Sequence, residues 1–358
     1  MFNLTPRNTL NNNWTILSPI ISILCTIIIA ALIFKILNYP VLESLYQVFL
    51  SPFSRADRIA DVIVKACPLI IIASGLIFCF KANIWNIGAE GQFIIGALSA
   101  GFFALLFPNS DSYFLLICML IISALGGAIW ALIPGLLKVK YNVNEILVSL
   151  MLVYVAILLI DFIVRGPLRD PTSFGFPLSK PYPDGAIISK INIPFIGYLG
   201  QLHYGIILII IFIPLCSFLL YKTLPGFQIK VLGSSQKSVD FAGFSKNKII
   251  IYVLLFSGGM SGVAGFIEVS ANMGQLQPEI SFGYGFTAII VAFLGRLNPY
   301  GIILAGIVIA TAKLGADNAQ MTLGIPKVVT GIFEGLLLFF LLAGETLQNY
   351  KIKFQGIK

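Results

Sequence analysis

The sequence is poor in charge and in histidine, and both shortages narrow what the protein can be. Only 11% of its 358 residues are charged, against roughly 25% in a typical soluble domain. Because His203 is the single histidine, a zinc site built on two histidines is excluded, and a Ser-His-Asp triad would have no other histidine to use. His203 stands at a predicted helix start beside Tyr204, so we expect it at the membrane interface rather than as a ligand.

Motifs for redox, metal and nucleotide chemistry are also missing. The chain contains no CxxC pair and no GxxxxGKS/T loop, and Gly233–Ser238 imitates only the end of such a loop. We therefore expect no catalytic residue, no metal and no resident cofactor, and ATP hydrolysis would have to come from another subunit. The cysteines lie in apolar runs and are expected to be small buried hydrophobic side chains; they are Cys25, Cys67, Cys79, Cys118 and Cys216.

Hydrophobic residues, in contrast, are abundant. They make up 58% of the chain, and the mean hydropathy is +0.95. Since about 20 apolar residues cross a bilayer as a helix, the predicted fold class is an all-α polytopic membrane protein with about ten transmembrane helices. The expected spans are Ile16–Leu37, Ile59–Phe80, Gln92–Phe107, Tyr113–Leu137, Glu145–Val164, Tyr204–Tyr221, Ile249–Val269, Phe286–Leu297, Ile302–Leu314 and Val328–Ala343.

Some segments are too short for an ordinary crossing. The third, eighth and ninth spans are short at about 1.5 Å per residue, so we expect tilted, broken or re-entrant pieces there. The stretch Val41–Phe53 alternates apolar and polar residues too briefly to span, and we expect it at the interface. The predicted organisation is a tail at 1–15, a single transmembrane domain at 16–343 and a second tail at 344–358.

The distribution of lysine and arginine predicts the orientation. The loop Lys222–Lys248 and the C-terminal tail are rich in lysine, which favours the cytoplasm for both. An even number of spans then puts the N-terminal tail in the cytoplasm too. The connection 166–203, which is rich in proline and glycine, is expected to be an ordered external lobe.

The most informative stretch is the polar segment Lys81–Gln92, which separates two apolar runs. It places Asn86, Glu90 and Gln92 around glycines where a helix would begin. Polar groups and broken helices at membrane depth are tolerated only against protein or a wet cavity, and the N–H groups of a helix start could bind a polar solute. The alternative is a plain cytoplasmic turn whose glycines cap helices, and the spacing alone does not decide between the two.

A second polar cluster opens the fifth span. Asn144 is expected to be an N-cap, and Glu145 to interact favourably with the helix dipole. These local roles alone could explain both residues; contact with a solute is the alternative.

Ionisable residues inside the spans are costly, at about 2.5–3.5 kcal/mol near the bilayer centre, and should face protein or water. Glu334 lies between Gly331 and Gly335, whose spacing allows close helix approach. Glu334 is thus either part of a helix interface or a pathway residue. Lys65 is expected to snorkel outward. The remaining charged residues of this kind are Glu268, Lys313 and Asp317.

The loop Gly226–Lys248 mixes apolar, small and basic residues between glycines. A short helix here could lie along the membrane and dock in a groove on a soluble partner. A merely solvated basic loop is the alternative.

Four blocks of sequence, in order, resemble a known family. Asn86–Gln92 resembles the NIGxEGQ signature of permease subunits in bacterial ABC importers of the ribose, branched-chain amino acid and nucleoside group. Val143–Leu152 resembles the VNEVISTLML stretch of that family, Gly233–Gly243 its cytoplasmic coupling segment, and Gly285–Pro299 its GFDAIAVALLGRNNP block. The nearest branch is the one paired with basic-membrane-protein-type lipoproteins.

The resemblance implies a type II importer fold in a bacterial inner membrane. It implies two permease subunits, identical or related, two ATPase subunits and an external substrate-binding lipoprotein. It also implies uptake of nucleosides, with purine nucleosides as the expected cargo. Thr287 stands where the family usually has Asp, Ser238-Val239 where an Ala-Ala pair is usual, and Glu334 where Gln is common. The coupling residues that it implies are Gly233, Ser238, Val239, Ala242 and Gly243.

The residues that we expect along the solute path carry amides and carboxylates, which suit ribose hydroxyls and base edges. Simple sugars such as ribose are the alternative cargo. A secondary transporter with Glu268 or Glu334 as its proton site is a rival interpretation. A membrane-embedded enzyme is another, but Asp170 and Asp184 are too sparse to favour it. The expected path residues are Asn86, Glu90, Gln92, Asn144, Glu145 and Glu334.

Overall fold

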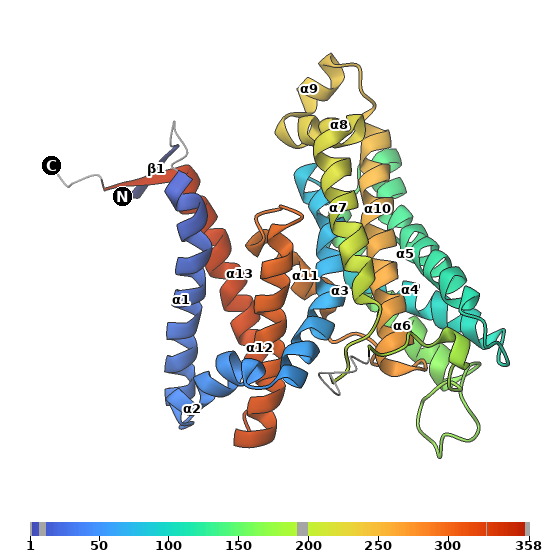
Figure 1. Cartoon of the computed structure of the whole chain (residues 1–358). Coiled ribbons are helices and arrows are strands. Elements are labelled where there is room, and N and C mark those ends of the chain that lie inside the picture. The colour runs from blue at the N-terminus through green and yellow to red at the C-terminus, as the bar shows by residue number, and fades with distance from the viewer. Residues whose placement is uncertain (1, 7–11, 192–199, 327, 355–358) are drawn as a thin grey trace. The chain divides into compact units, whose positions relative to one another are not determined.

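A computed structural model describes residues 2–6, 12–191, 200–326 and 328–354 of the chain (Figure 1). Most of these residues are helical, which confirms the predicted all-α polytopic membrane fold. They also form one two-stranded antiparallel sheet that the sequence did not predict, between β1 (Phe2–Pro6) and β2 (Tyr350–Phe354). The chain divides into two compact units, one formed by Met1–Arg55 with Thr311–Lys358 and the other by Ala56–Ala310.

The larger unit contains most of the helices. Its elements are α3 (Ala56–Lys81), α4 (Ala89–Leu105), α5 (Phe114–Tyr141), α6 (Glu145–Arg165), the 3-10 turn η3 (Asp184–Ala186), α7 (Ile206–Lys222), α8 (Leu224–Ser234), α9 (Gln236–Phe241), α10 (Lys246–Ile267), the π-helix η4 (Glu268–Met273) and α11 (Tyr284–Leu294).

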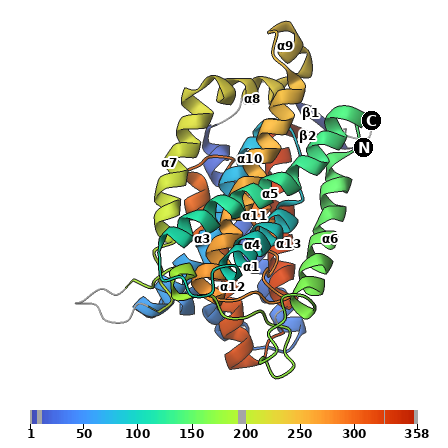
Figure 2. The same ribbon diagram turned by 90° about the vertical axis from the view of Figure 1, so that its right-hand side faces the viewer.

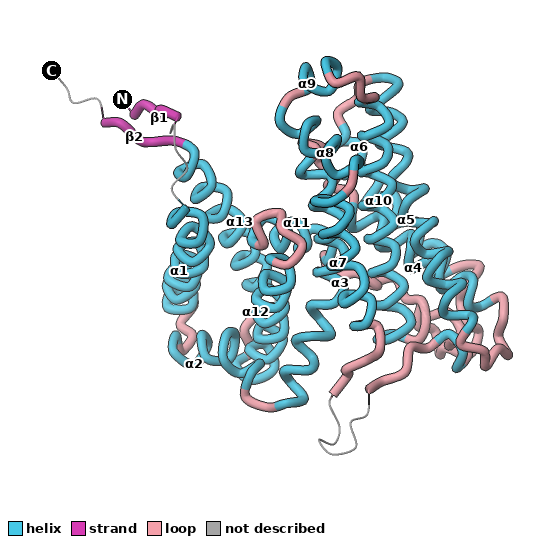
Figure 3. Tube along the Cα trace, turned by 45° about the horizontal axis from the view of Figure 1, so that its top comes forward, coloured by secondary structure: helices cyan, strands magenta, loops and turns pink. Residues whose placement is uncertain are grey.

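The smaller unit contains both ends of the chain. Its elements are β1, α1 (Asn12–Ile36), α2 (Val41–Leu45), the π-helix η1 (Tyr46–Leu50), the 3-10 turn η2 (Ser51–Phe53), α13 (Val328–Asn349) and β2, and α12 (Gly301–Leu323) runs from the larger unit into it. Figure 3 shows the paired strands at the two ends of the chain.

Each of the ten predicted spans corresponds to a helix. Among the described residues, five helices are long and apolar enough to cross a membrane, namely α3, α5, α6, α10 with η4, and α12. Helices α7 and α8 pass the same criterion as a pair, bent by 68°. Shorter apolar helices account for the other four spans and are formed by α4, α11 and parts of α1 and α13.

The length of the ninth span differs from the prediction. We expected a short piece ending at Leu314, but α12 continues to Leu323 and has 23 residues. The helix continues past the apolar run through Asp317, Asn318 and Gln320, and Lys313 forms a salt bridge with Glu334 on α13. The third and eighth spans are short as expected, since α4 has 17 residues and α11 has 11.

Helices α4, α5 and α10 cross at a glycine seam at the centre of the larger unit (Figure 2). A Cβ on Gly96 would lie 2.2 Å from Cα of Gly262, and a Cβ on Gly127 would lie 2.2 Å from the carbonyl oxygen of Gly258. Small residues let helix backbones approach closely in membranes. The packing interpretation of Gly258–Gly262 is thus confirmed.

In the smaller unit, α1 packs on α13 through an apolar core. The rings of Phe34 and Phe333 meet edge to face, with centroids 5.4 Å apart. Val48, from the predicted interfacial stretch, is buried in the same core. Gly331 and Gly335, in contrast, have no neighbour within 4 Å of an added Cβ. The expected close helix approach at these two glycines is therefore wrong, because α13 contacts its neighbours through other faces.

The connection between α6 and α7 is held by backbone hydrogen bonds. Ser179 N donates to Leu276 O (3.0 Å), and Leu276 N donates to the Ser179 hydroxyl (2.8 Å). Tyr182 N donates to the carbonyl oxygen of Gly274 at 2.8 Å, and Ile188 N donates to that of Ser270 at 2.9 Å. The segment Ser179–Ile188 therefore lies against η4 and the residues after it, as an ordered lobe would.

His203 ends this connection. Its side chain is 0% exposed and therefore lies within the protein. Gly205 N donates to His203 Nδ1 at 3.1 Å, so the imidazole closes a local turn. Burial, together with the nearby charge of Lys190, lowers the pKa of His203 to about 4. His203 is thus neutral at pH 7.

Cysteines behave largely as expected. All five are free; Cys67, Cys79 and Cys216 are buried, whereas Cys25 and Cys118 are half-buried.

Candidate functional site

The polar segment after α3 is a buried break between two helices. Asn83 takes a left-handed conformation (φ 56°), and the chain then runs non-helically until α4 begins at Ala89. Asn83 is exposed, but Ile84 and Asn86 are buried. The segment is therefore mostly enclosed by protein rather than a plain solvated turn, although Gly88 does stand at the N-cap of α4.

Asn86 and Gln92 are joined through their side-chain amides. Asn86 Nδ2 donates to Gln92 Oε1 and Gln92 Nε2 donates to Asn86 Oδ1, both at 2.9 Å. Asn86 Nδ2 also donates to the Ser257 hydroxyl at 3.0 Å, and Gly88 N donates to Asn86 Oδ1 at 3.1 Å. These bonds occupy both donors and both acceptor positions of the Asn86 amide. Asn86 therefore fastens the break to α10.

Glu90 joins the starts of two short helices, α4 and α11. Its carboxylate accepts hydrogen bonds from Gly283 N (3.2 Å) and Gly285 N, the backbone donors at the N-terminus of α11. A carboxylate there satisfies orphan N–H groups and interacts favourably with the helix dipole. A Cβ on Gly285 would lie 2.2 Å from Glu90 N, so the two helix starts touch through their backbones.

Three aromatic rings lie beside this break. Phe80, Trp85 and Phe293 have centroids 4.9 to 5.8 Å apart, and Trp85 stacks on Phe293 with an interplanar angle of 27°. All three side chains are half-buried. Polar break and aromatic cluster together form a surface with both hydrogen-bonding and stacking character.

Asn144 and Glu145 have the local roles that the sequence predicts. The Asn144 side chain accepts a hydrogen bond from Ile146 N at 2.9 Å and thereby caps α6. Glu145 lies in the first turn and forms a salt bridge with Lys138 Nζ at 2.7 Å. One turn further along α6, Ser149 packs against Gly88. Helix α6 thus touches the break, but Asn144 itself is exposed.

Glu334 belongs to the smaller unit, unlike the other five expected path residues. It forms a salt bridge with Lys313 Nζ at 3.2 Å, and both side chains are mostly buried. Of the other ionisable residues in spans, Glu268 accepts a hydrogen bond from Asn272 Nδ2 at 2.8 Å and is buried. Lys65 is half-buried, with Nζ 6.0 Å from the centroid of the Phe282 ring.

The segment expected to couple to an ATPase is helical. Gly233 lies in the last turn of α8, whereas Ser238 and Val239 lie in α9. Val239 is 0% exposed and anchors α9, while Phe241 is 97% exposed beside the exposed Ala242 and Gly243. The short-helix interpretation of this loop is therefore confirmed.

A close backbone contact connects this segment to the break. A Cβ on Gly233 would lie 1.9 Å from the carbonyl oxygen of Lys81, the last residue of α3, and 3.5 Å from Cα of Ala82. The end of α8 therefore rests directly on the backbone where the break begins.

A family of permease components from the branched-chain amino acid transport system matches residues 58–342 of the chain. The chain belongs to this family. It is therefore a multi-pass membrane protein and a non-catalytic permease subunit of an ABC importer. Membership overturns the rival interpretations as an ion-coupled secondary transporter and as a membrane-embedded enzyme. Because ABC importers work with an ATPase and a binding protein, membership implies partners of these two kinds for the permease.

Three relatives of the permease are named after the solutes that their transporters carry across the membrane. The glucose ABC transporter permease protein TsgB13 of Haloferax volcanii is 29% identical over 98% of this chain and 93% of its own length. The guanosine ABC transporter permease protein NupP of Bacillus subtilis is 28% identical over 95% of both chains. The nucleoside ABC transporter permease protein NupB of Lactococcus lactis is 25% identical over 97% of this chain and 96% of its own.

Two residues of the permease site escaped the sequence analysis. Ser257 receives a hydrogen bond from Asn86, but it stands in an apolar helix with no local signal. Trp130 lies next to Gly91, and its buried Nε1 has no hydrogen-bond partner among the described residues. A tryptophan inside a span carries a donor that needs a partner, and this was the signal that could have found it.

Proposed function

We propose that this permease subunit imports nucleosides, with purine nucleosides as the preferred cargo. The observation that carries the proposal is the likeness, along nearly the whole chain, to permeases for guanosine and for nucleosides. The four sequence blocks that resemble the nucleoside branch support it.

The site offers matching chemistry. A nucleoside has a flat base and a hydroxylated ribose, and the break places the rings of Phe80, Trp85 and Phe293 beside polar groups. Stacking of a base on an aromatic side chain is worth about 1–3 kcal/mol. Bare sugars would gain less from such a cluster.

The proposed solute path keeps the six residues expected from the sequence but gives them different tasks. Asn86, Glu90 and Gln92 hold the two helix starts in place, so that the surface beside them is preorganised. Asn144 and Glu145 position α6 against this surface. Glu334 stays a proposed path residue, and within the smaller unit it pairs with Lys313.

The proposed assembly follows from the same family. An ATPase subunit seats on Gly233–Gly243, and its movement reaches the break through the contact of Gly233 with Lys81. A second permease subunit, identical or related, and an external substrate-binding lipoprotein complete the importer. Both chain termini face the cytoplasm of a bacterial cell, and 166–203 faces outward.

Uptake of radiolabelled guanosine, ribose and glucose tests the cargo, in cells that carry the permease with its ATPase and binding protein. Saturable guanosine uptake that is lost on deletion of the ATPase and resists excess ribose or glucose supports the proposal. Sugar import is the second candidate, because the glucose permease is similar over 98% of this chain. Uptake of glucose or ribose without guanosine would establish it instead.

The aromatic cluster allows a sharper test. Replacing Trp85 by Leu removes a stacking partner, so we expect the KM for guanosine to rise about tenfold, from the 1–3 kcal/mol of a stacked base. Trp85→Phe keeps a ring and should lose much less. Equal KM values for Leu and Phe variants would remove Trp85 from the path.

A further inference from the structure

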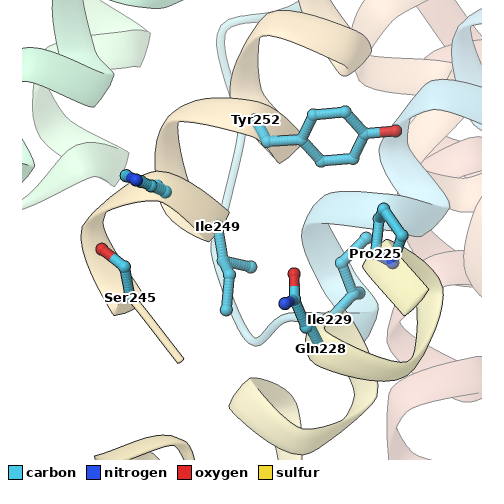
Figure 4. A pocket seen from close by; sticks show the side chains of 7 residues that line it. Pro225, Gln228, Ile229, Ser245, Ile249 and Tyr252 are labelled. Carbon is cyan, nitrogen blue, oxygen red and sulfur yellow. The ribbon is translucent and has the colours of Figure 1, made fainter. Parts of the chain in front are cut away.

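The larger unit contains a cavity between α8 and the first two turns of α10, away from the break. Its volume is about 240 Å³, far more than the roughly 10–15 Å³ that a single water needs. Figure 4 shows Ile249 and Tyr252 of α10 facing Pro225 and Ile229 of α8. The complete lining is Pro225, Gln228, Ile229, Ser245, Lys248, Ile249 and Tyr252.

The cavity has an apolar floor and a polar, cationic rim. Ile229 and Ile249 are buried, whereas Ser245 and Lys248 are exposed. From Ser245 to Tyr252 is two helical turns, about 10 Å along α10. One end therefore offers a hydroxyl and an ammonium, and the other offers apolar side chains and a phenol ring.

The only charged side chain in the lining of this cavity is the positively charged Lys248. No carboxylate lines it, and neither α8 nor the first two turns of α10 contains Asp or Glu. Lys230 lies nearby, with Nζ 4.5 Å from the centroid of the Tyr221 ring. The Ser245 side chain makes no capping hydrogen bond to α10. The rim therefore favours an anion.

The surroundings indicate a membrane lipid as the source of that anion. Helix α7 leads to the cavity with a stripe of exposed apolar residues that includes Phe218 and Tyr221. The chain then bends by 68° into α8, where Leu224 and Phe227 are 61% and 55% exposed. A short helix that bends away from a membrane span and exposes apolar side chains is typical of a helix lying at the membrane surface.

We propose that this cavity binds the phosphate headgroup of an anionic phospholipid. The phosphate lies at the rim against Lys248 and Ser245, the glycerol backbone rests on Ile229 and Ile249, and the acyl chains follow the apolar stripe of α7. Basic pockets between membrane helices bind anionic headgroups in this way. An inorganic phosphate would make no use of the apolar floor.

Native mass spectrometry of the purified permease tests the site by titration with phosphatidylglycerol or phosphatidylcholine. We expect Lys248→Gln to weaken phosphatidylglycerol binding about fivefold, since one lysine near a membrane surface contributes about 1 kcal/mol. Lys248→Arg keeps the charge and should bind as the unmodified protein does. Lys140→Gln, at an exposed lysine of α5 outside the cavity, is the matched control and should not change binding.

Three results would overturn the proposal. Equal losses of phosphatidylglycerol binding in the Lys248→Gln and Lys140→Gln variants would mean that the lipid is held only by general charge attraction. Displacement of phosphatidylglycerol by millimolar inorganic phosphate would assign the rim to free phosphate. If the lipid is absent when the ATPase is bound and binds again after the ATPase is removed, the cavity would be a binding site for the ATPase instead.

Discussion

Two carboxylates of this permease look alike in the sequence and differ in the structure. Glu90 stands among Gly88 and Gly91, and Glu334 stands between Gly331 and Gly335. Glu90 accepts hydrogen bonds from two backbone N–H groups across a contact where a glycine is required. Glu334 pairs with a lysine, and a Cβ added to either neighbouring glycine would have no neighbour within 4 Å. The comparison teaches that glycine beside a membrane carboxylate does not by itself mark a close helix contact.

Substitution of the glycines should separate the two sites most clearly. Gly285→Ala forces a Cβ to within 2.2 Å of Glu90 N, and overpacking against backbone should cost about 3 kcal/mol. We expect a large fall in the Tm of the purified permease, measured by differential scanning fluorimetry. Gly331→Ala is the matched control and should leave Tm unchanged or raise it, because alanine favours a helix over glycine by about 1 kcal/mol. Similar Tm values for both variants would contradict the close contact at Gly285.

Removal of the Glu90 carboxylate should have the next largest effect. Glu90→Ala leaves the N–H groups of Gly283 and Gly285 without this acceptor, at about 1–3 kcal/mol for each buried group. We expect uptake to fall at least tenfold, with permease still present in the membrane at a reduced level. Glu90→Gln keeps one acceptor oxygen and should lose less than Glu90→Ala. Unchanged uptake in both variants would exclude a role for Glu90 in holding α11.

The salt bridge in the smaller unit can be measured by a double-mutant cycle. Lys313→Met and Glu334→Gln each remove one group of a mostly buried ion pair. The two single losses of stability should therefore add up to more than the loss in the double variant. We expect a coupling energy of about 1–2 kcal/mol from chemical denaturation. Strictly additive losses would mean that the two groups do not stabilise each other.

The smallest effect is expected at the exposed cap of α6. Asn144→Ala removes the bond to Ile146 N and should cost about 1 kcal/mol. We expect a small fall in Tm and a moderate fall in uptake while the permease still assembles. Asn144→Ser keeps a capping oxygen and should restore both. An uptake defect that Ser does not restore would instead point to direct contact between the Asn144 amide and solute.

Local signals were enough to predict part of this molecule. The cap at Asn144 was predictable because its side chain bonds a backbone N–H only two residues away. The ten apolar runs predicted the helices for a similar reason, since hydropathy is a local property. The polar break was also visible as polar residues between two such runs.

Contacts between distant residues were not predictable in this way. Glu90 bonds backbone groups 193 and 195 residues away, and Asn86 bonds a serine 171 residues away. The length of α12 was missed because Lys313, which interrupts the apolar run, pairs with Glu334 on another helix. Each of these depends on tertiary neighbours that no window of sequence contains.

The paired strands at the chain ends have a consequence for how the protein can be rearranged. Residues 2–6 lie in register with 354–350, so a few linking residues would join the two ends into a ring. The ring could be reopened at Phe174–Phe176, where both phenylalanines are largely exposed. Exposed loop tips are the sites where such circular permutation succeeds. A permuted chain would insert its helices into the membrane in a new order while every contact of the folded protein stayed available.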